Sequence, residues 1–251
     1  MNSGLASVLP AVRQLADNNS SESIVIDAEK ATLLYVHWYA KIWQTITMTP
    51  SIDFYFDFSS PYGYLASKKI EALAEKHNRL VNWHPILLGA IFKITKQAPL
   101  TTYPLKGDYA LMDFARTARE TGLPYRHPTE FPIGAVAASR ASYWLTEHED
   151  PSIATRAVPF IHAIFAAYYC DDRNISLPAV VLEVAASVGI DPNTLEISLS
   201  KQEIKDRLRS AVEAALERKV FGSPTLFVDD QQFWGNDRME QLDRWLTRGG
   251  W

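Results

Sequence analysis

The chain has 251 residues, of which 47% are hydrophobic and 22% charged, so it can bury a core and is not disordered throughout. Its formal net charge of −4 argues against a nucleic-acid-binding surface and against a polybasic membrane patch. A single cysteine, Cys170, excludes an intramolecular disulfide, a Cys-x-x-Cys redox pair and a cysteine-rich zinc site, and it is typical of a cytoplasmic protein without a structural metal.

Residues 1–47 differ from the rest of the sequence. Aromatic side chains recur at helical spacing over residues 31–46, and Met48 stands directly before a strong strand pattern. Two interpretations stay open: an extension from an upstream start codon, with Met48 as the working start, or a genuine docking helix or lipid-facing segment. No apolar run reaches about 18 residues, so no membrane-spanning helix is predicted.

A β-α-β unit opens the main part of the sequence. Residues 51–58 (SIDFYFDF) place an apolar side chain at every second position, which predicts a strand. A Ser-Pro pair at positions 60 and 61 signals a helix start, and a helix is predicted over 62–78. Residues 80–88 are hydrophobic at consecutive positions and predict an interior strand. The two strands are expected to be parallel with a right-handed crossover.

From about residue 89 to residue 219 the pattern is mainly helical. Helices are predicted over 108–121, 135–147, 152–169, 178–188 and 201–219. Pro159 is expected to begin, kink or divide the helix over 152–169. Two strands, at 225–228 and 232–234, and a helix at 237–248 close the chain. The order βαβ, helical block, ββα predicts one α/β domain (48–88 and 220–251) with an all-helical insertion (89–219).

Ser60 is the first candidate for chemistry, because it lies between a strand and the start of a helix. A helix N-terminus presents unpaired N–H groups and a partial positive charge, which together stabilise an anion. A serine hydroxyl placed there can donate a hydrogen bond to an incoming thiolate and lower its pKa. The alternative is that Ser60 is only the helix cap.

Two further segments lie near the C-terminus. In residues 221–225 (FGSPT), Pro224 opens a strand and the preceding peptide bond can be cis, which would leave the Ser223 backbone free to pair with an extended peptide. The alternative is an ordinary loop proline. In residues 234–238 (WGNDR), an amide and a carboxylate beside an exposed aromatic ring could bind an ammonium and a carboxylate group. The alternative is that Asn236 caps the last helix and Asp237 occupies its first turn.

Taken together, these segments carry a family resemblance. The strand 53–58 leading to Ser-Pro, the segment 217–222 (ERKVFG) and the segment 234–238 resemble, in order and spacing, the DsbA-like branch of the thioredoxin superfamily. Within that branch the chain resembles 2-hydroxychromene-2-carboxylate isomerases and their relatives, the kappa-class glutathione transferases. The resemblance covers about 200 residues from Ile52 onwards. It implies a thioredoxin-like domain with a helical insertion, glutathione as cofactor and a homodimer.

The resemblance also implies roles for single residues. Ser60 matches the catalytic serine and stands where thioredoxin-like oxidoreductases have the first cysteine of Cys-x-x-Cys. The implied glutathione-binding residues are Ser60, Ser223, Pro224, Trp234, Gly235, Asn236 and Asp237. Lys93 matches a lysine that contacts the substrate carboxylate. The chain departs from the family pattern at Phe131, which stands where a tyrosine of the substrate pocket is expected, and in residues 98–102, where an Asn-Arg pair has no match.

The function that the resemblance implies is isomerisation of 2-hydroxychromene-2-carboxylate, or a related aromatic carboxylate, by reversible addition of the glutathione thiolate, in the breakdown of aromatic hydrocarbons. Two alternatives stay open. One is a kappa-like glutathione transferase or peroxidase, which would consume glutathione. The other is a non-catalytic thioredoxin-like binding module, which would bind glutathione without turnover.

Overall fold

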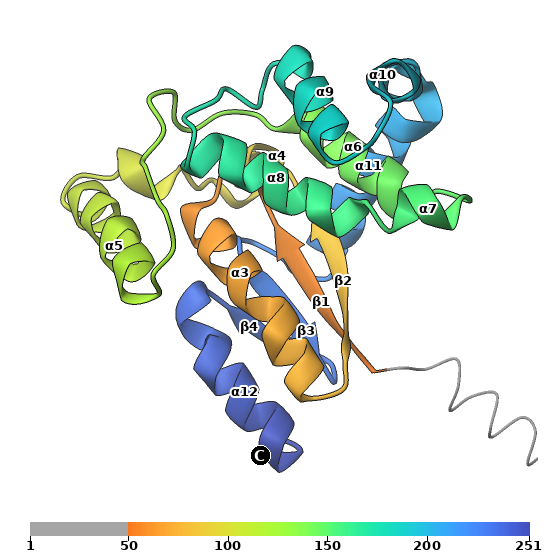
Figure 1. The fold of residues 1–251 in the computed structure, drawn as a ribbon. Coiled ribbons are helices and arrows are strands. Elements are labelled where there is room, and N and C mark those ends of the chain that lie inside the picture. The colour runs from red at the N-terminus through yellow and green to blue at the C-terminus, as the bar shows by residue number, and fades with distance from the viewer. Residues whose placement is uncertain (1–49) are drawn as a thin grey trace, which may run out of the picture. The chain divides into compact units, whose positions relative to one another are not determined.

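Four strands form one mixed sheet in the part of the chain that the computed structural model describes, residues 50–251 (Figure 1). The strands are β1 (Ser51–Phe56), β2 (Leu80–Pro85), β3 (Thr225–Val228) and β4 (Gln231–Trp234), and their order in the sheet is β2-β1-β3-β4. β1 pairs with β2 in parallel, whereas β1–β3 and β3–β4 are antiparallel. The predictions for residues 1–47 and for Met48 lie outside the described residues.

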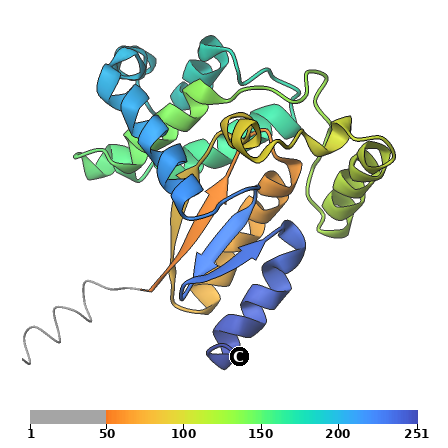
Figure 2. The ribbon, with the colours of Figure 1, turned by 180° about the vertical axis from the view of Figure 1, so that it is seen from behind.

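Helices cover one face of the sheet and one of its ends, and the helix α11 (Gln202–Glu217) packs against Tyr55 and Phe227 on the other face. The α-helices are α3 (Pro61–Lys76), α4 (Leu88–Thr95), α5 (Lys106–Glu120), α6 (Val136–Thr146), α7 (Pro151–Ala154), α8 (Ala157–Tyr169), α9 (Pro178–Ser187), α10 (Pro192–Ser200), α11 (Gln202–Glu217) and α12 (Met239–Arg248), and the 3₁₀ helices are η1 (Leu100–Thr102) and η2 (Asn236–Arg238). Figures 1 and 2 show α3 and α12 side by side on one face, with the helices between β2 and β3 gathered near the carboxyl ends of β1 and β2. No helix within residues 50–251 is long and apolar enough to cross a bilayer.

The β-α-β unit is confirmed, but the prediction for its second strand is wrong in two respects. β2 ends at Pro85 and not at residue 88, and within residues 50–251 it is an edge strand with β1 as its only neighbour. The apolar residues that follow belong to a second cluster, in which Ile86 and Ile91 pack beside α11. A run of apolar side chains is buried equally well by a strand inside a sheet or by a helix on a core, so the run alone did not decide between them.

The helical block between β2 and β3 contains the predicted helices and also helices that were not predicted. The helix expected over 152–169 is divided into α7 and α8, and Pro159 lies in the first turn of α8. The helices α4 and α10 were not predicted. The start of α10 carried a usable signal, because Asp191 caps it through the Thr194 N–H and Pro192 follows directly, as Pro61 follows Ser60. The boundaries proposed for the insertion, 89 and 219, stay a prediction.

Aromatic rings fill the core between β1, α3 and α8. Phe56, Phe58 and Phe165 have no exposed surface, and their ring centroids lie 5.0–5.5 Å apart. Tyr64 on α3 and Tyr169 on α8 extend this cluster, with ring centroids 5.1 Å apart. The period-2 pattern of β1 therefore points toward α3 and α8, and the cluster fixes the turn that joins β1 to α3.

A separate polar network lies on β1 and involves Asp53. Its carboxylate accepts hydrogen bonds from Asn82 (2.8 Å), from Arg218 (2.6 Å) and, at 3.3 Å, from His84. Burial raises the pKa of Asp53, but the hydrogen bonds outweigh burial and hold the pKa well below its usual range. Arg218 follows α11, so this network ties the end of that helix to the sheet.

Candidate active site

Ser60 lies at the N-terminus of α3, as predicted, and its hydroxyl has two partners. The Gly63 N–H donates to Ser60 Oγ (3.0 Å), so the side chain caps the helix, and Pro61 is the first helical residue. Ser60 Oγ in turn donates to the backbone oxygen of Ser223 (2.9 Å). The hydroxyl oxygen therefore caps the helix while the hydroxyl hydrogen serves a second partner. The hydroxyl can donate to an anion once its hydrogen turns away from the Ser223 carbonyl.

The loop that carries Ser223 lies directly against this turn. The Ser223–Pro224 peptide bond is cis, as the sequence suggested. The Asp57 N–H donates to Ser223 Oγ (2.9 Å). The structure thus brings together two predicted site residues that are 163 positions apart in the sequence.

Close approach between the turn and this loop explains why residue 63 is glycine. A Cβ atom at Gly63 would lie 2.8 Å from Ser223 Oγ and 3.1 Å from Ser60 Cβ. Gly63→Ala is therefore expected to lower the free energy of unfolding by about 1–3 kcal/mol, although alanine favours a helix over glycine by about 1 kcal/mol. Urea unfolding measures this. Gly89→Ala is the matched control, because Gly89 is also helical and has no atom within 4 Å of its Cβ position. Equal stability of the two variants would contradict the close packing.

The segment 234–238 adjoins the same loop. The Gly235 N–H donates to the Pro224 oxygen (3.0 Å), and Gly235 has φ = 116°, which favours glycine. The Trp234 ring lies on Gly222 and against Phe221, with ring centroids 4.8 Å apart. Trp234 and Gly235 therefore contact the loop that carries Ser223 and Pro224.

Asn236 and Asp237 differ in their surroundings. The expectation that Asn236 caps the last helix is wrong, because it is the first residue of η2 and α12 starts at Met239. Asn236 is 8% exposed, and its Oδ1 atom has no hydrogen-bond partner among the described residues. The Asp237 side chain is 73% exposed. A buried acceptor and an exposed carboxylate thus stand next to each other at the end of β4.

A row of aromatic rings leads from α3 to Phe131. The Tyr62 ring lies 4.8 Å from that of Phe114, which faces His127 at 6.4 Å, and His127 lies 4.6 Å from Phe131. The Tyr62 hydroxyl donates to Asp113 (2.6 Å), which ties α3 to α5. Burial, the hydrogen bond to Asp113 and its charge raise the pKa of Tyr62 well above its usual value, so the hydroxyl stays protonated. The rings of Phe114 and His127 therefore form a continuous row between Tyr62 and Phe131.

Lys93 is not in contact with the other predicted residues. It lies on α4 and is exposed, and its side chain forms no hydrogen bond or ion pair with another residue in the range 50–251. Its side chain is free to meet a ligand.

Sequence reasoning did not find Asp57 or Tyr62. Asp57 is 4% exposed and follows β1 directly. A buried acid at the carboxyl end of a strand was a usable signal for Asp57. Tyr62 carried none, since its partner Asp113 lies 51 residues away.

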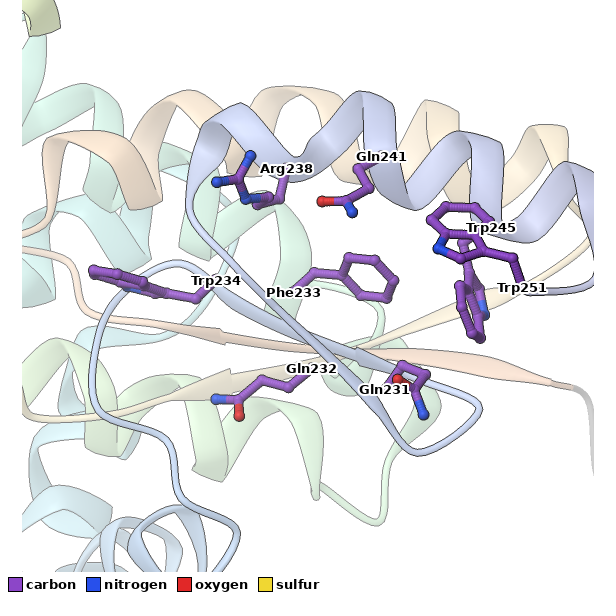
Figure 3. Close-up of a pocket in the computed structure, with 8 residues that line it drawn as sticks. All are labelled: Gln231, Gln232, Phe233, Trp234, Arg238, Gln241, Trp245 and Trp251. Carbon is purple, nitrogen blue, oxygen red and sulfur yellow. The ribbon is translucent and has the colours of Figure 1, made fainter.

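A hollow of about 220 Å³ lies beside β4 and α12. Figure 3 shows the residues that line it: Gln231, Gln232, Phe233, Trp234, Arg238, Gln241, Trp245 and Trp251. It shares Trp234 with the predicted glutathione segment, but neither Ser60 nor Ser223 lines it. The described residues contain no cluster of three or more side chains suited to a metal.

Known proteins support the family resemblance. The family model of the DSBA-like thioredoxin domain matches residues 51–247. The 2-hydroxychromene-2-carboxylate isomerase of Sphingobium xenophagum is 31% identical over 205 residues, which cover 79% of this chain and 99% of that protein. Glutathione S-transferase kappa 1 of Rattus norvegicus is 25% identical over 214 residues, covering 78% of this chain and 92% of that protein.

A solved structure agrees with these sequence relatives. A selenomethionine form of 2-hydroxychromene-2-carboxylate isomerase superposes with a TM-score of 0.68 at 29% identity, covering 78% of this chain and 94% of that one. The thioredoxin-like fold with its helical insertion is thereby confirmed. The chain belongs to the DSBA-like thioredoxin domain family, and within it to the family of the 2-hydroxychromene-2-carboxylate isomerases.

Proposed function

We propose that this protein is a glutathione-dependent isomerase, which converts 2-hydroxychromene-2-carboxylate or a related aromatic carboxylate to the trans-o-hydroxybenzylidenepyruvate form. The observation that carries the proposal is the position of Ser60. Its hydroxyl caps α3 and contacts the Ser223 backbone. By the family resemblance, Ser60 matches the position of the first cysteine in redox proteins of this fold. The relatives named as isomerases support the choice of reaction.

The donor and acceptor set of the site fits glutathione. The Ser223 backbone offers pairing to an extended peptide. Asn236 Oδ1, a buried acceptor without a partner among residues 50–251, suits the ammonium group of a γ-glutamyl end. Trp234 and Asp237 flank that position. When bound, glutathione would supply a thiolate for reversible addition to the conjugated double bond of the substrate, so none would be consumed.

The chain's own residues then have three tasks. Ser60 donates its hydroxyl hydrogen to the sulfur anion, and the N-terminus of α3 adds favourable N–H groups and a partial positive charge. Lys93, which is exposed and has no ion-pair partner among residues 50–251, holds the substrate carboxylate. Phe131 and the aromatic row that starts at Tyr62 contact the substrate ring.

The test is to incubate the protein with 2-hydroxychromene-2-carboxylate and to follow the absorbance of the trans product. The expected result is conversion that requires glutathione and leaves the thiol titre constant. Conversion at the same rate without glutathione would contradict the cofactor assignment. No conversion, with saturable glutathione binding, would mean that the substrate is another electrophile.

A second function is favoured by the kappa-class relative, which is named a glutathione transferase. A transferase or peroxidase would consume glutathione, so a falling thiol titre selects it. Glutathione binding without any turnover selects the binding module. We further propose a homodimer and a cytoplasmic location, and gel filtration with light scattering tests the first of these.

A further inference from the structure

We propose that Asp57 is a positioning residue for this reaction, because its buried carboxylate fixes the start of α4, and with it Lys93, to the turn that carries Ser60. The inference rests on the proposed function. Asp57 is not one of the residues that the sequence or the family resemblance assigned to the site.

Asp57 contacts all three segments that meet at the site. Its Oδ1 accepts from the Ser59 N–H (2.7 Å), and its Oδ2 accepts from the Leu88 N–H (2.6 Å). Its backbone contributes separately, because the Asp57 oxygen accepts from the Ser60 N–H (3.0 Å) and the Asp57 N–H donates to Ser223 Oγ (2.9 Å). The backbone therefore joins Ser60 to Ser223, and only the side chain adds α4.

The start of α4 depends on this carboxylate. Its N-cap residue is Leu87, whose apolar side chain cannot accept a hydrogen bond, so the first N–H groups of the helix need an acceptor from elsewhere. Asp57 supplies one in a carboxyl group that is almost fully buried. Burial raises the pKa of Asp57 above its usual value and outweighs the hydrogen bonds from the N–H groups of Leu88 and Ser59, which act to lower it. A buried N–H that loses such an acceptor is costly, so α4 would shift.

Two substitutions break this contact from opposite sides. Asp57→Asn keeps the shape and the backbone hydrogen bonds but replaces one acceptor oxygen with a donor. Leu88→Pro removes the donor. Proline is tolerated at the first residue of a helix, and Leu87 already has the extended backbone (φ −116°, ψ 99°) that proline requires before it. Asp53→Asn is the matched control, since it removes a carboxylate of β1 whose partners lie outside the site.

The expected result is a change in KM for the aromatic carboxylate without a change in the affinity for glutathione. Asp57→Asn and Leu88→Pro should each raise KM for the aromatic carboxylate about tenfold, which corresponds to the loss of one buried hydrogen bond. The dissociation constant of glutathione, measured by calorimetry, should stay within about twofold, because the backbone contacts persist. Asp53→Asn should change neither quantity. An unchanged KM, or an equal loss of glutathione affinity in Asp57→Asn, would overturn the proposal.

A second measurement separates this inference from the proposed function. If the wild-type protein shows no isomerisation, the proposed function fails, and amide hydrogen exchange followed by mass spectrometry decides the role of Asp57. Exchange over residues 88–95 should be faster in Asp57→Asn than in the wild type and unchanged in Asp53→Asn. Unchanged exchange of α4 in Asp57→Asn would overturn the positioning role.

Discussion

Replacing Ser60 by alanine is expected to lower kcat/KM for isomerisation by about 10²–10³, the range found when one preorganised hydrogen-bond donor to a reacting anion is removed. The site offers its hydroxyl at the N-terminus of α3 and against the Ser223 backbone. Since the hydroxyl stabilises the anionic form of the thiol, its loss raises the pKa of the bound thiol. The acid limb of the pH–rate profile should therefore move to higher pH, and initial rates across pH measure both effects.

The control for Ser60→Ala must reproduce the loss of a helix cap. Ser60 caps α3 through the Gly63 N–H, so the substitution also costs about 1 kcal/mol of stability. Asp191→Ala removes the equivalent cap of α10, where Asp191 accepts from the Thr194 N–H (3.0 Å). It should lose similar stability and keep wild-type turnover. Turnover of Ser60→Ala at the wild-type rate would remove Ser60 from the mechanism.

The second large effect is expected in the core. Phe165→Ala should lower the free energy of unfolding by about 3–5 kcal/mol, because it leaves a cavity in a fully buried aromatic cluster. The Phe165 ring has no exposed surface and meets Phe56, Phe58 and Tyr64 at centroid distances of 5.5, 5.0 and 5.9 Å. A domain of this kind has about 5–15 kcal/mol in total, so a large share would be lost.

Urea unfolding checks this expectation, and Tyr109→Ala is its control. Tyr109 is also an aromatic residue on a helix, but it is 55% exposed, so its removal should change stability by about 0.5 kcal/mol or less. A loss below about 1 kcal/mol in Phe165→Ala would show that the cavity collapses and that the aromatic cluster does not hold β1 against α8.

Much of the fold could be predicted because its signals are local. The alternation in residues 51–58 predicted β1, and the Ser-Pro pair predicted a helix from residue 62, one residue after the observed start of α3. The prediction fails where one sequence pattern is compatible with two kinds of secondary structure. The apolar run after residue 80 was assigned wholly to a strand, yet the chain turns at Pro85 and continues as α4, because Ile91 packs against α11, more than 100 residues further on.

For the candidate site, too, some features could be predicted from the sequence and others could not. The sequence by itself determined that Ser60 caps a helix beside the end of a strand. The order and spacing of its motifs also determined the family. Only the tertiary structure decided that Ser60 contacts Ser223, that Asp57 receives the N–H of Leu88, and that Tyr62 binds Asp113. Helix caps and strand periodicity depend on neighbours within a few residues and are therefore visible in a sequence. These contacts join segments 31 to 163 residues apart, and they form only when the sheet and the aromatic core bring those segments together.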